Sequence, residues 1–290
     1  MSLRGGLYAQ FHDRRRAALP LLFPAIGGLY YLWAFDAPSR LIAVNAGALA
    51  AALVWIMLGR LPKARGVRIG IAAALVLALF VPLLTGPDLG GVRRWIAAGP
   101  VNLHSGALAL PLLVMLAARE ERAGPAYLGL ATLALALQPD AAALAALALA
   151  CAVLAVRWRS GGFAAVSTVA AVLTALTFGY GALEPQRYTE GVLAHVAERS
   201  LWQAVMLGIL LFVVPLWHLV WEPQFTRAEG YALGALLTGL GAMALIAPFP
   251  FPLIGYGAAP ILGFGLALGA ARRRDQFGIT DYLETLDRAR

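Results

Sequence analysis

The sequence predicts an all-α polytopic membrane protein with about ten transmembrane helices. Of its 290 residues, 61% are hydrophobic and only 13% are charged, whereas a soluble domain carries about 25% charged residues. The hydrophobic residues also fall into ten stretches that polar residues, Gly or Pro separate. Finally, Lys and Arg concentrate in alternate connecting segments. Together these observations indicate a chain whose surface mostly faces lipid.

The ten apolar stretches contain no Lys, Arg, Asp or Glu. Several are shorter than the roughly 20 residues that cross a bilayer, so their ends are predicted to within a few residues. The first is too long for the apolar region of a signal peptide and is predicted to be a span. The stretches are Ala17–Phe35, Leu41–Leu58, Ile69–Leu84, Ser105–Ala118, Ala126–Leu137, Ala141–Val156, Phe163–Gly181, Leu201–Trp221, Tyr231–Ala247 and Phe251–Ala271.

The Lys and Arg residues predict the orientation. If the N-terminus is cytoplasmic, the cytoplasmic segments hold 18 of the 23 Lys and Arg residues and the outer segments hold five. The positive-inside rule produces such a bias. Both termini are therefore predicted to be cytoplasmic, and the net charge of +8 needs no nucleic-acid partner. The outer five are Arg40, Arg93, Arg94, Arg187 and Arg199.

One domain fills most of the chain. Residues 1–271 are predicted to form a single transmembrane domain, and residues 272–290 a cytoplasmic tail. In this tail Ile279, Tyr282, Leu283 and Leu286 have helical spacing, which predicts a short amphipathic helix at the membrane surface.

Cysteine and histidine exclude two classes of site. Cys151 is the only cysteine, so a disulfide framework or a cysteine metal site is ruled out. The four histidines, at positions 12, 104, 195 and 218, have no ligand-like spacing. We therefore predict no structural metal site.

The first outer segment of interest contains Arg93, Arg94 and Trp95, followed by Gly99-Pro100. One interpretation is an interfacial anchor, because Trp and Arg favour the headgroup level and Gly-Pro makes a turn. The other is a phosphate site, which the planar guanidinium suits.

Gln138-Pro139-Asp140 precedes the sixth stretch. Its simplest interpretation is local, since Asp140 would cap the N-terminus of the following helix.

The most polar outer segment extends from Glu184 through Arg187 and Glu190 to Glu198. If it is helical, Glu190, Ala194 and Glu198 share one face. It is either a solvated loop or the position of a general base, Glu190, beside a membrane-embedded groove.

Two further features concern the backbone. Pro248, Pro250 and Pro252, followed by Gly255-Tyr256-Gly257, precede the last span. Such a backbone breaks a helix at membrane depth, which is tolerated only inside protein or along a cavity. The pairs Gly230/Gly234 and Gly265/Gly269 predict close helix packing.

The order of these motifs resembles one family: the SEDS proteins (shape, elongation, division and sporulation), the RodA/FtsW class of ten-span peptidoglycan polymerases. The family's Gly-x-x-Arg-Trp-Ile…Gly-Pro is similar to residues 91–100, and its Gln-Pro-Asp matches residues 138–140. Its outer loop, Pro-Glu-x-His-Thr-Asp-Phe-Ile, is similar to residues 185–192. Its Pro-Leu-Pro-Phe-Ile-Ser-Tyr-Gly-Gly-Ser-Ser is similar to residues 250–260.

The resemblance implies a site and a location. In the family the outer-loop aspartate is the essential acid, which places Glu190 at the catalytic position. Arg93, Arg94 and Arg187 are then candidates to bind the substrate diphosphate, with Trp95, Gln138, Asp140, Tyr256 and Gly257 as supporting motif residues. The family implies the bacterial cytoplasmic membrane, a polyprenyl-diphosphate-linked sugar as substrate, and a single-span transpeptidase of the class B penicillin-binding type as partner. No resident cofactor is expected, and a divalent cation is one candidate to neutralise the leaving diphosphate.

This sequence also departs from the family. The family's motif Gln-Pro-Ser-Glu-Leu-Ala-Lys corresponds to residues 104–110 of this chain, which lack the acid and the lysine. The serines of the family's last motif are also absent. Two functions therefore stay open: a glycosyltransferase polymerising a lipid II-like substrate, or an inactive relative that binds lipid or acts as a scaffold. A flippase or transporter ranks last, because coupled transporters usually carry ionisable groups within their spans.

Overall fold

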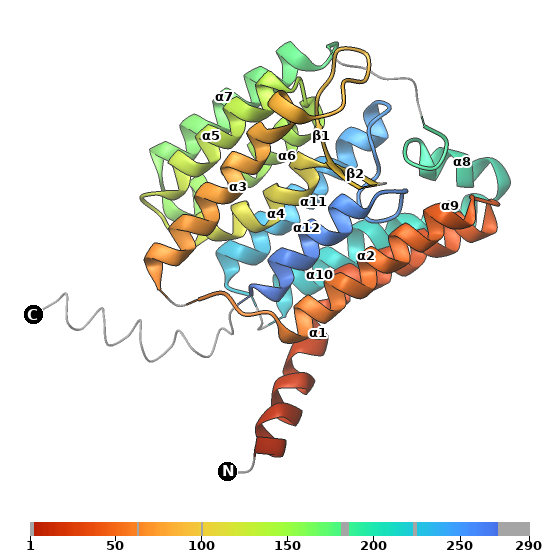
Figure 1. Ribbon diagram of the computed structural model, residues 1–290, viewed down its shortest axis with the longest axis horizontal. Coiled ribbons are helices and arrows are strands. Elements are labelled where there is room, and N and C mark those ends of the chain that lie inside the picture. Colours follow the sequence, from red (N-terminus) through yellow and green to blue (C-terminus); the bar gives the residue numbers. More distant parts are fainter. Residues whose placement is uncertain (1–2, 63, 100, 181–185, 223–224, 272–290) are drawn as a thin grey trace, which may run out of the picture.

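The computed structural model describes residues 3–62, 64–99, 101–180, 186–222 and 225–271, with the side chains of residues 3–13 excepted. The predicted amphipathic helix of the tail lies outside the described residues. The chain forms a helical bundle with one small hairpin (Figure 1). Its elements are α1 (Leu3–Ala34), α2 (Ser39–Leu58), α3 (Arg65–Thr85), β1 (Trp95–Ala98), β2 (Val101–His104), α4 (Ser105–Ala118), α5 (Gly124–Leu137), α6 (Ala141–Trp158), α7 (Gly161–Thr177), α8 (Val192–Arg199), α9 (Leu201–Gly208), the π-helical turn η1 (Ile209–Val213), α10 (Val214–Trp221), α11 (Arg227–Ile246) and α12 (Ala258–Gly269).

Each predicted span corresponds to a helix, and the eighth consists of α9, η1 and α10 in succession. Among the described residues, six helical segments have the length and composition to cross a membrane. The other four apolar helices, α4, α5, α7 and α12, are shorter. The chain is a multi-pass membrane protein, as its hydropathy predicts.

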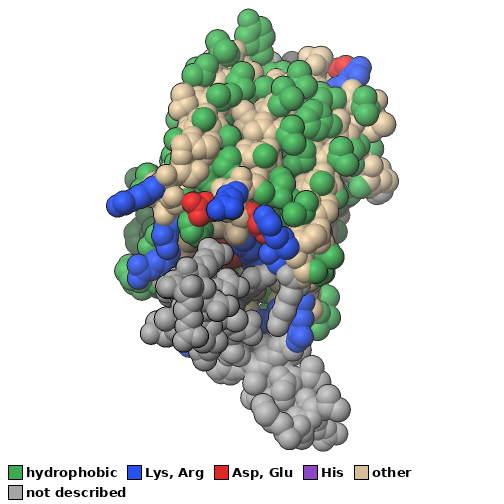
Figure 2. All heavy atoms as spheres, turned by 90° about the vertical axis from the view of Figure 1, so that its left-hand side faces the viewer, with side chains coloured by type: hydrophobic (Ala, Val, Ile, Leu, Met, Phe, Trp, Pro, Cys, Tyr) green, Lys and Arg blue, Asp and Glu red, His purple; other side chains and the backbone are tan. Residues whose placement is uncertain are grey.

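The surface fits this arrangement. Large hydrophobic side chains are exposed along the outer helices, among them Trp33, Leu77, Val156, Leu176 and Trp217. Figure 2 shows a broad surface dominated by hydrophobic side chains, with most of its Lys and Arg side chains gathered in one band. Exposed apolar surface on this scale would be a liability in water and is ordinary against lipid.

The interior is built by close helix contacts. α6 packs against α7 and α11, and α12 packs against α2 and α4. A Cβ added at Gly265 would collide with Ala52, and one added at Gly269 would collide with Trp55. The predicted packing role of this glycine pair is therefore confirmed.

The structure differs from the sequence predictions in four places, three of which concern the backbone. Residues 95–104 form a two-stranded antiparallel hairpin, with Gly99 at φ +60° in its turn, in an otherwise helical protein. α8 begins at Val192, so Glu190 lies before the helix and does not share its face with Ala194 and Glu198. The last helix begins at Ala258 rather than Phe251 because the proline-rich backbone before it stays irregular.

A fourth difference concerns charge. α11 begins at Arg227, so Glu229 lies in its first turn, fully buried, where it forms a capping box with Thr226 and an ion pair with Arg119 at the end of α4. The apolar stretch was predicted to begin at Tyr231, so this ion pair was not predicted. The ion pair joins the predicted cytoplasmic ends of two central helices.

Candidate functional site

A buried polar cluster lies where the hairpin meets the ends of α5 and α6. Arg94 is 6% exposed, and its guanidinium donates from Nε to the Gln138 carbonyl at 3.0 Å and from Nη2 to the Pro139 carbonyl. The Arg94 carbonyl in turn accepts from the Ser105 N–H at 2.9 Å. Arg94 therefore attaches the hairpin to the Gln-Pro-Asp turn.

His104 and Asp140 face each other inside this cluster. Their Nε2 and Oδ2 atoms are 3.3 Å apart, and Asp140 is 2% exposed. His104 Nδ1 accepts from the Ala107 N–H at 3.2 Å, and Asp140 Oδ1 accepts from the Ala143 N–H at 3.2 Å. Each residue thus caps a helix, α4 or α6, so the predicted cap at Asp140 is confirmed.

These contacts fix the form of His104. Since Nδ1 accepts a backbone N–H, the ring proton of neutral histidine sits on Nε2, facing Asp140. Burial lowers the pKa of His104; Asp140 opposes this effect, and Arg94 adds to it. With Nδ1 accepting a backbone N–H and Nε2 facing Asp140, His104 joins two helices and is not placed to act as a base.

Gln138 completes the cluster. Its Oε1 accepts from the Ser105 hydroxyl at 3.0 Å, and its Nε2 donates to the Leu79 carbonyl in α3. His104 and Ser105 are positions at which the sequence departs from the SEDS pattern, and here they bond to the Gln-Pro-Asp residues. Trp95 packs edge-on against His104, with ring centroids 6.0 Å apart.

Glu190 has a different environment. Residues 186–190 form a tight turn in which the Thr189 and Glu190 N–H groups both donate to the Gln186 carbonyl at 3.0 Å. The Glu190 side chain is half-buried and accepts a hydrogen bond from the Gln186 N–H at 3.3 Å. Gly191 follows at φ +62°, a conformation that favours glycine, and lets the chain turn into α8.

The ionisation of Glu190 is perturbed. Burial raises its pKa, while the hydrogen bond from Gln186 and the positive charge of Arg94 oppose the rise. A carboxylate with a raised pKa is a stronger base, and such perturbation is typical of functional carboxyl groups.

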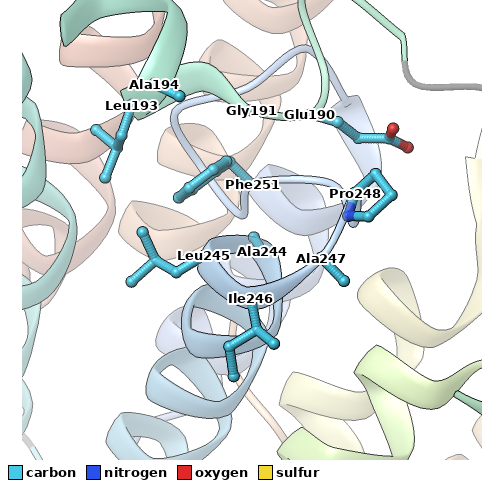
Figure 3. Close-up of a pocket in the computed structure, with 10 residues that line it drawn as sticks. All are labelled: Glu190, Gly191, Leu193, Ala194, Ala244, Leu245, Ile246, Ala247, Pro248 and Phe251. Carbon is cyan, nitrogen blue, oxygen red and sulfur yellow. The ribbon is translucent and has the colours of Figure 1, made fainter.

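Glu190 lies on the edge of an apolar pocket of about 300 Å³ (Figure 3). The pocket is formed by the end of α11, the segment that follows it, and the start of α8. Its other lining residues are Gly191, Leu193, Ala194, Ala244, Leu245, Ile246, Ala247, Pro248 and Phe251. In the close-up the carboxylate is turned away from the apolar side chains of α11. The pocket therefore has a carboxylate at its edge.

The other two predicted arginines are more exposed. Arg93 forms an ion pair with Asp88 at 3.2 Å and is close to the Leu83 carbonyl. Arg187 lies in the Glu190 turn, with its guanidinium over the Tyr188 ring at 5.6 Å. Of the three, Arg94 is the one whose charge acts on Glu190.

The proline-rich segment and the Glu190 turn are joined by backbone hydrogen bonds. Phe251 N–H donates to the Thr189 carbonyl at 2.9 Å, and Tyr256 N–H donates to the Tyr188 carbonyl at 2.7 Å. Tyr256 thus supports the turn through its backbone.

Sequence reasoning missed Asn45, a buried amide in α2. Its Nδ2 donates to the Gly255 carbonyl and its Oδ1 accepts from the Gly257 N–H, both at 3.1 Å. Asn45 is the only amide in its apolar stretch, and such a side chain in a span usually bonds across helices. That signal could have identified it.

No protein-family model matches the sequence, and no curated protein matches it. Solved structures do. The rod shape determining protein RodA of Thermus thermophilus is similar with a TM-score of 0.61 and 23% identity, over 86% of this chain and 93% of that chain. An Asp-to-Ala mutant of it gives a TM-score of 0.64 at 23% identity, over 86% and 94% of the two chains.

The chain has the RodA fold. A further RodA-like neighbour is a chain from a study of how a peptidoglycan synthase complex coordinates polymerization and crosslinking. It has a TM-score of 0.57 and 20% identity, over 88% of this chain and 96% of that chain. The fold that the SEDS-like motifs predicted is therefore confirmed.

Proposed function

We propose that this protein is a SEDS-type glycosyltransferase of the bacterial cytoplasmic membrane. It would polymerise a lipid II-like, undecaprenyl-diphosphate-linked sugar during peptidoglycan synthesis, in cell shape or division. The observation that carries the proposal is the half-buried Glu190 carboxylate beside an apolar pocket, in a chain with the RodA fold. An apolar pocket suits a prenyl chain, and a carboxylate with raised pKa suits proton abstraction.

In the proposed reaction Glu190 accepts the proton of an acceptor sugar hydroxyl. The hydroxyl oxygen then attacks the anomeric carbon of the lipid-linked sugar and forms the new C–O bond. The bond from that carbon to the diphosphate breaks, and the diphosphate leaves with its prenyl chain. General base catalysis of this kind contributes about 10²- to 10⁴-fold.

The leaving diphosphate requires positive charge. Arg93, Arg94 and Arg187 remain our candidates, since guanidinium groups bind phosphate oxygens in bidentate geometry. Within the described residues, no group of three His, Cys, Asp or Glu side chains is arranged to hold a metal ion.

The test is polymerisation of fluorescent lipid II by the purified protein in detergent, with and without a class B transpeptidase. Wild-type protein should form polymer and Glu190→Gln should form none, because glutamine cannot accept the proton. Tyr30→Phe serves as a matched control, since Tyr30 is 47% exposed on α1. Equal product from wild type and Glu190→Gln would overturn the assignment of Glu190.

A second function is favoured by one observation. The guanidinium of Arg94 is bonded to two backbone carbonyls, and Asp140 caps α6, so both have structural tasks in the described chain. An inactive relative that binds lipid or supports a transpeptidase would need Arg94 and Asp140 only for these structural tasks. This function would be favoured if wild type and Glu190→Gln both bind lipid II and neither forms polymer.

A further inference from the structure

The backbone around Glu190 is held from the outer end of α1, independently of the polar cluster. Tyr31, in α1, is fully buried, yet its hydroxyl reaches two segments far along the chain. It is 3.2 Å from the Arg187 carbonyl and 3.0 Å from His195 Nδ1. One hydroxyl thus bridges the turn before Glu190 and the helix after it.

The hydrogen count assigns the direction of this bridge. A tyrosine hydroxyl has one proton, and a carbonyl oxygen can only accept. If Tyr31 donates to the Arg187 carbonyl, its oxygen accepts from His195, which must then carry a proton on Nδ1. In this arrangement the donors run from His195 to Tyr31 to the Arg187 carbonyl, which gives that carbonyl a side-chain donor.

Other contacts at the end of α1 act on the same two segments. The Tyr188 hydroxyl is 3.2 Å from the Phe35 carbonyl, and the His195 ring packs on the Phe35 ring with centroids 4.7 Å apart. Arg199 donates to the Ala34 carbonyl at 2.8 Å and lies over the Phe35 ring. Among these contacts from the end of α1, the Tyr31 hydroxyl is a fully buried side-chain group that bonds directly to the turn.

We propose that Tyr31, through His195, is a positioning residue for Glu190. The proposal rests on the proposed function for its kinetic consequence, although its structural part stands alone. Arg187 lies within the turn in which the Thr189 and Glu190 N–H groups donate to the Gln186 carbonyl. Loss of the Tyr31 hydroxyl therefore removes the hydrogen bond to the Arg187 carbonyl inside this turn. Tyr31 is fully buried and acts as a neutral donor in this arrangement.

The experiment compares Tyr31→Phe with Tyr30→Phe. Both remove one hydroxyl from α1, and Tyr30 is exposed where Tyr31 is buried. In lipid II polymerisation we expect Tyr31→Phe to lower kcat by about 10- to 100-fold with little change in KM, since small misplacements of a reacting group cost on this order. Tyr30→Phe should match wild type. Both variants should still show a thermal unfolding transition, as folded proteins do.

Hydrogen–deuterium exchange gives the second readout. Tyr31→Phe should speed exchange of the Thr189 and Glu190 amides by about tenfold or more, while the amides of α6 stay protected. If wild type makes no polymer, the proposed function fails and the exchange data alone decide the positioning role. Unchanged exchange in Tyr31→Phe overturns that role, whether or not kcat falls.

His195 supplies a graded check. His195→Asn keeps a donor close to the position of Nδ1, whereas His195→Leu removes it. We expect exchange at Thr189 and Glu190 to rise less in the asparagine variant than in the leucine variant. Equal exchange in the two would contradict the part of His195 in the bridge.

Discussion

Two regions near the predicted outer face of this bundle carry the residues that make its sequence resemble SEDS proteins, and they are built differently. Around Asp140, polar side chains are almost completely buried, and they bond to helix ends and backbone carbonyls. Around Glu190, the carboxylate is half-buried, accepts a backbone hydrogen bond from Gln186 at 3.3 Å and adjoins an apolar pocket.

The difference indicates a division of tasks. Most buried polar groups around Asp140 are hydrogen-bonded to helix ends and backbone carbonyls, and such groups stabilise the fold. Within the described residues, Asp140 Oδ2 has no hydrogen-bond partner and lies 3.3 Å from His104 Nε2. A partly solvated carboxylate with a raised pKa and few partners contributes little to stability and keeps its basicity. We infer that the Gln-Pro-Asp region holds the scaffold and that Glu190 performs the proposed chemistry.

After the complete loss expected for Glu190→Gln, the largest effect should come from moving the Glu190 carboxylate without removing its charge. Glu190→Asp keeps a carboxylate but moves it back by roughly 1 Å, and displacements of that size cost on the order of 100-fold in rate. We expect polymerisation in this variant between those of wild type and Glu190→Gln. An aspartate variant as inactive as the glutamine variant would show that position, and not charge alone, sets the activity.

Next in size is the loss of stability on changing Asp140. Asp140→Ala removes the cap of α6 and the partner of His104, which should destabilise the protein by about 2–4 kcal/mol. Asp140→Asn keeps a capping oxygen and should cost less. Thermal unfolding in detergent measures both variants. A stable Asp140→Ala protein that lacks activity would instead assign Asp140 to the chemistry.

The pH dependence should follow Glu190. A general base works when deprotonated, so the rate should fall as pH drops through the pKa of Glu190. Because burial raises that pKa, the fall should occur above pH 4.3, the ordinary value for glutamate. The folded-state pKa is raised, so protonation of Glu190 at low pH stabilises the fold slightly while activity is lost. A rate independent of pH between about 4 and 7 would contradict the role as base.

The smallest effect should come from Arg93. Its side chain is exposed and paired with Asp88, and exposed ion pairs contribute about 0–1 kcal/mol. Arg93→Gln should therefore leave stability within about 0.5 kcal/mol of wild type. If Arg93 also binds the diphosphate, the variant raises KM for lipid II, and an unchanged KM removes it from the candidates.

Much of the fold could be predicted from the sequence, because hydropathy is a property of whole stretches. Ten apolar stretches gave ten helical segments, and Ser105–Ala118 was predicted to the residue. Asp140 was predicted as a cap from its position before an alanine-rich run. The hairpin was missed because its strands have four residues each, too few for alternation to stand out.

The site could be predicted only in part, because contacts between distant segments leave no local pattern. From the motifs, Glu190 was predicted to lie beside a groove. The start of α8 at Val192 was not predicted. The bonds from Asn45 to the Gly255 and Gly257 backbone, and from Tyr31 to Arg187, cross more than 100 positions of sequence. The SEDS-like motifs also gave no sign that His104 and Ser105 would bond to Asp140 and Gln138.

The most direct test measures polymer formation and thermal unfolding together for wild type, Glu190→Gln and Asp140→Ala. We predict that Glu190→Gln unfolds like wild type and makes no polymer. Asp140→Ala should unfold at lower temperature and, at a temperature where it is folded, still make polymer. Polymer from Glu190→Gln, or a stable but inactive Asp140→Ala protein, would contradict the division of tasks between the two regions.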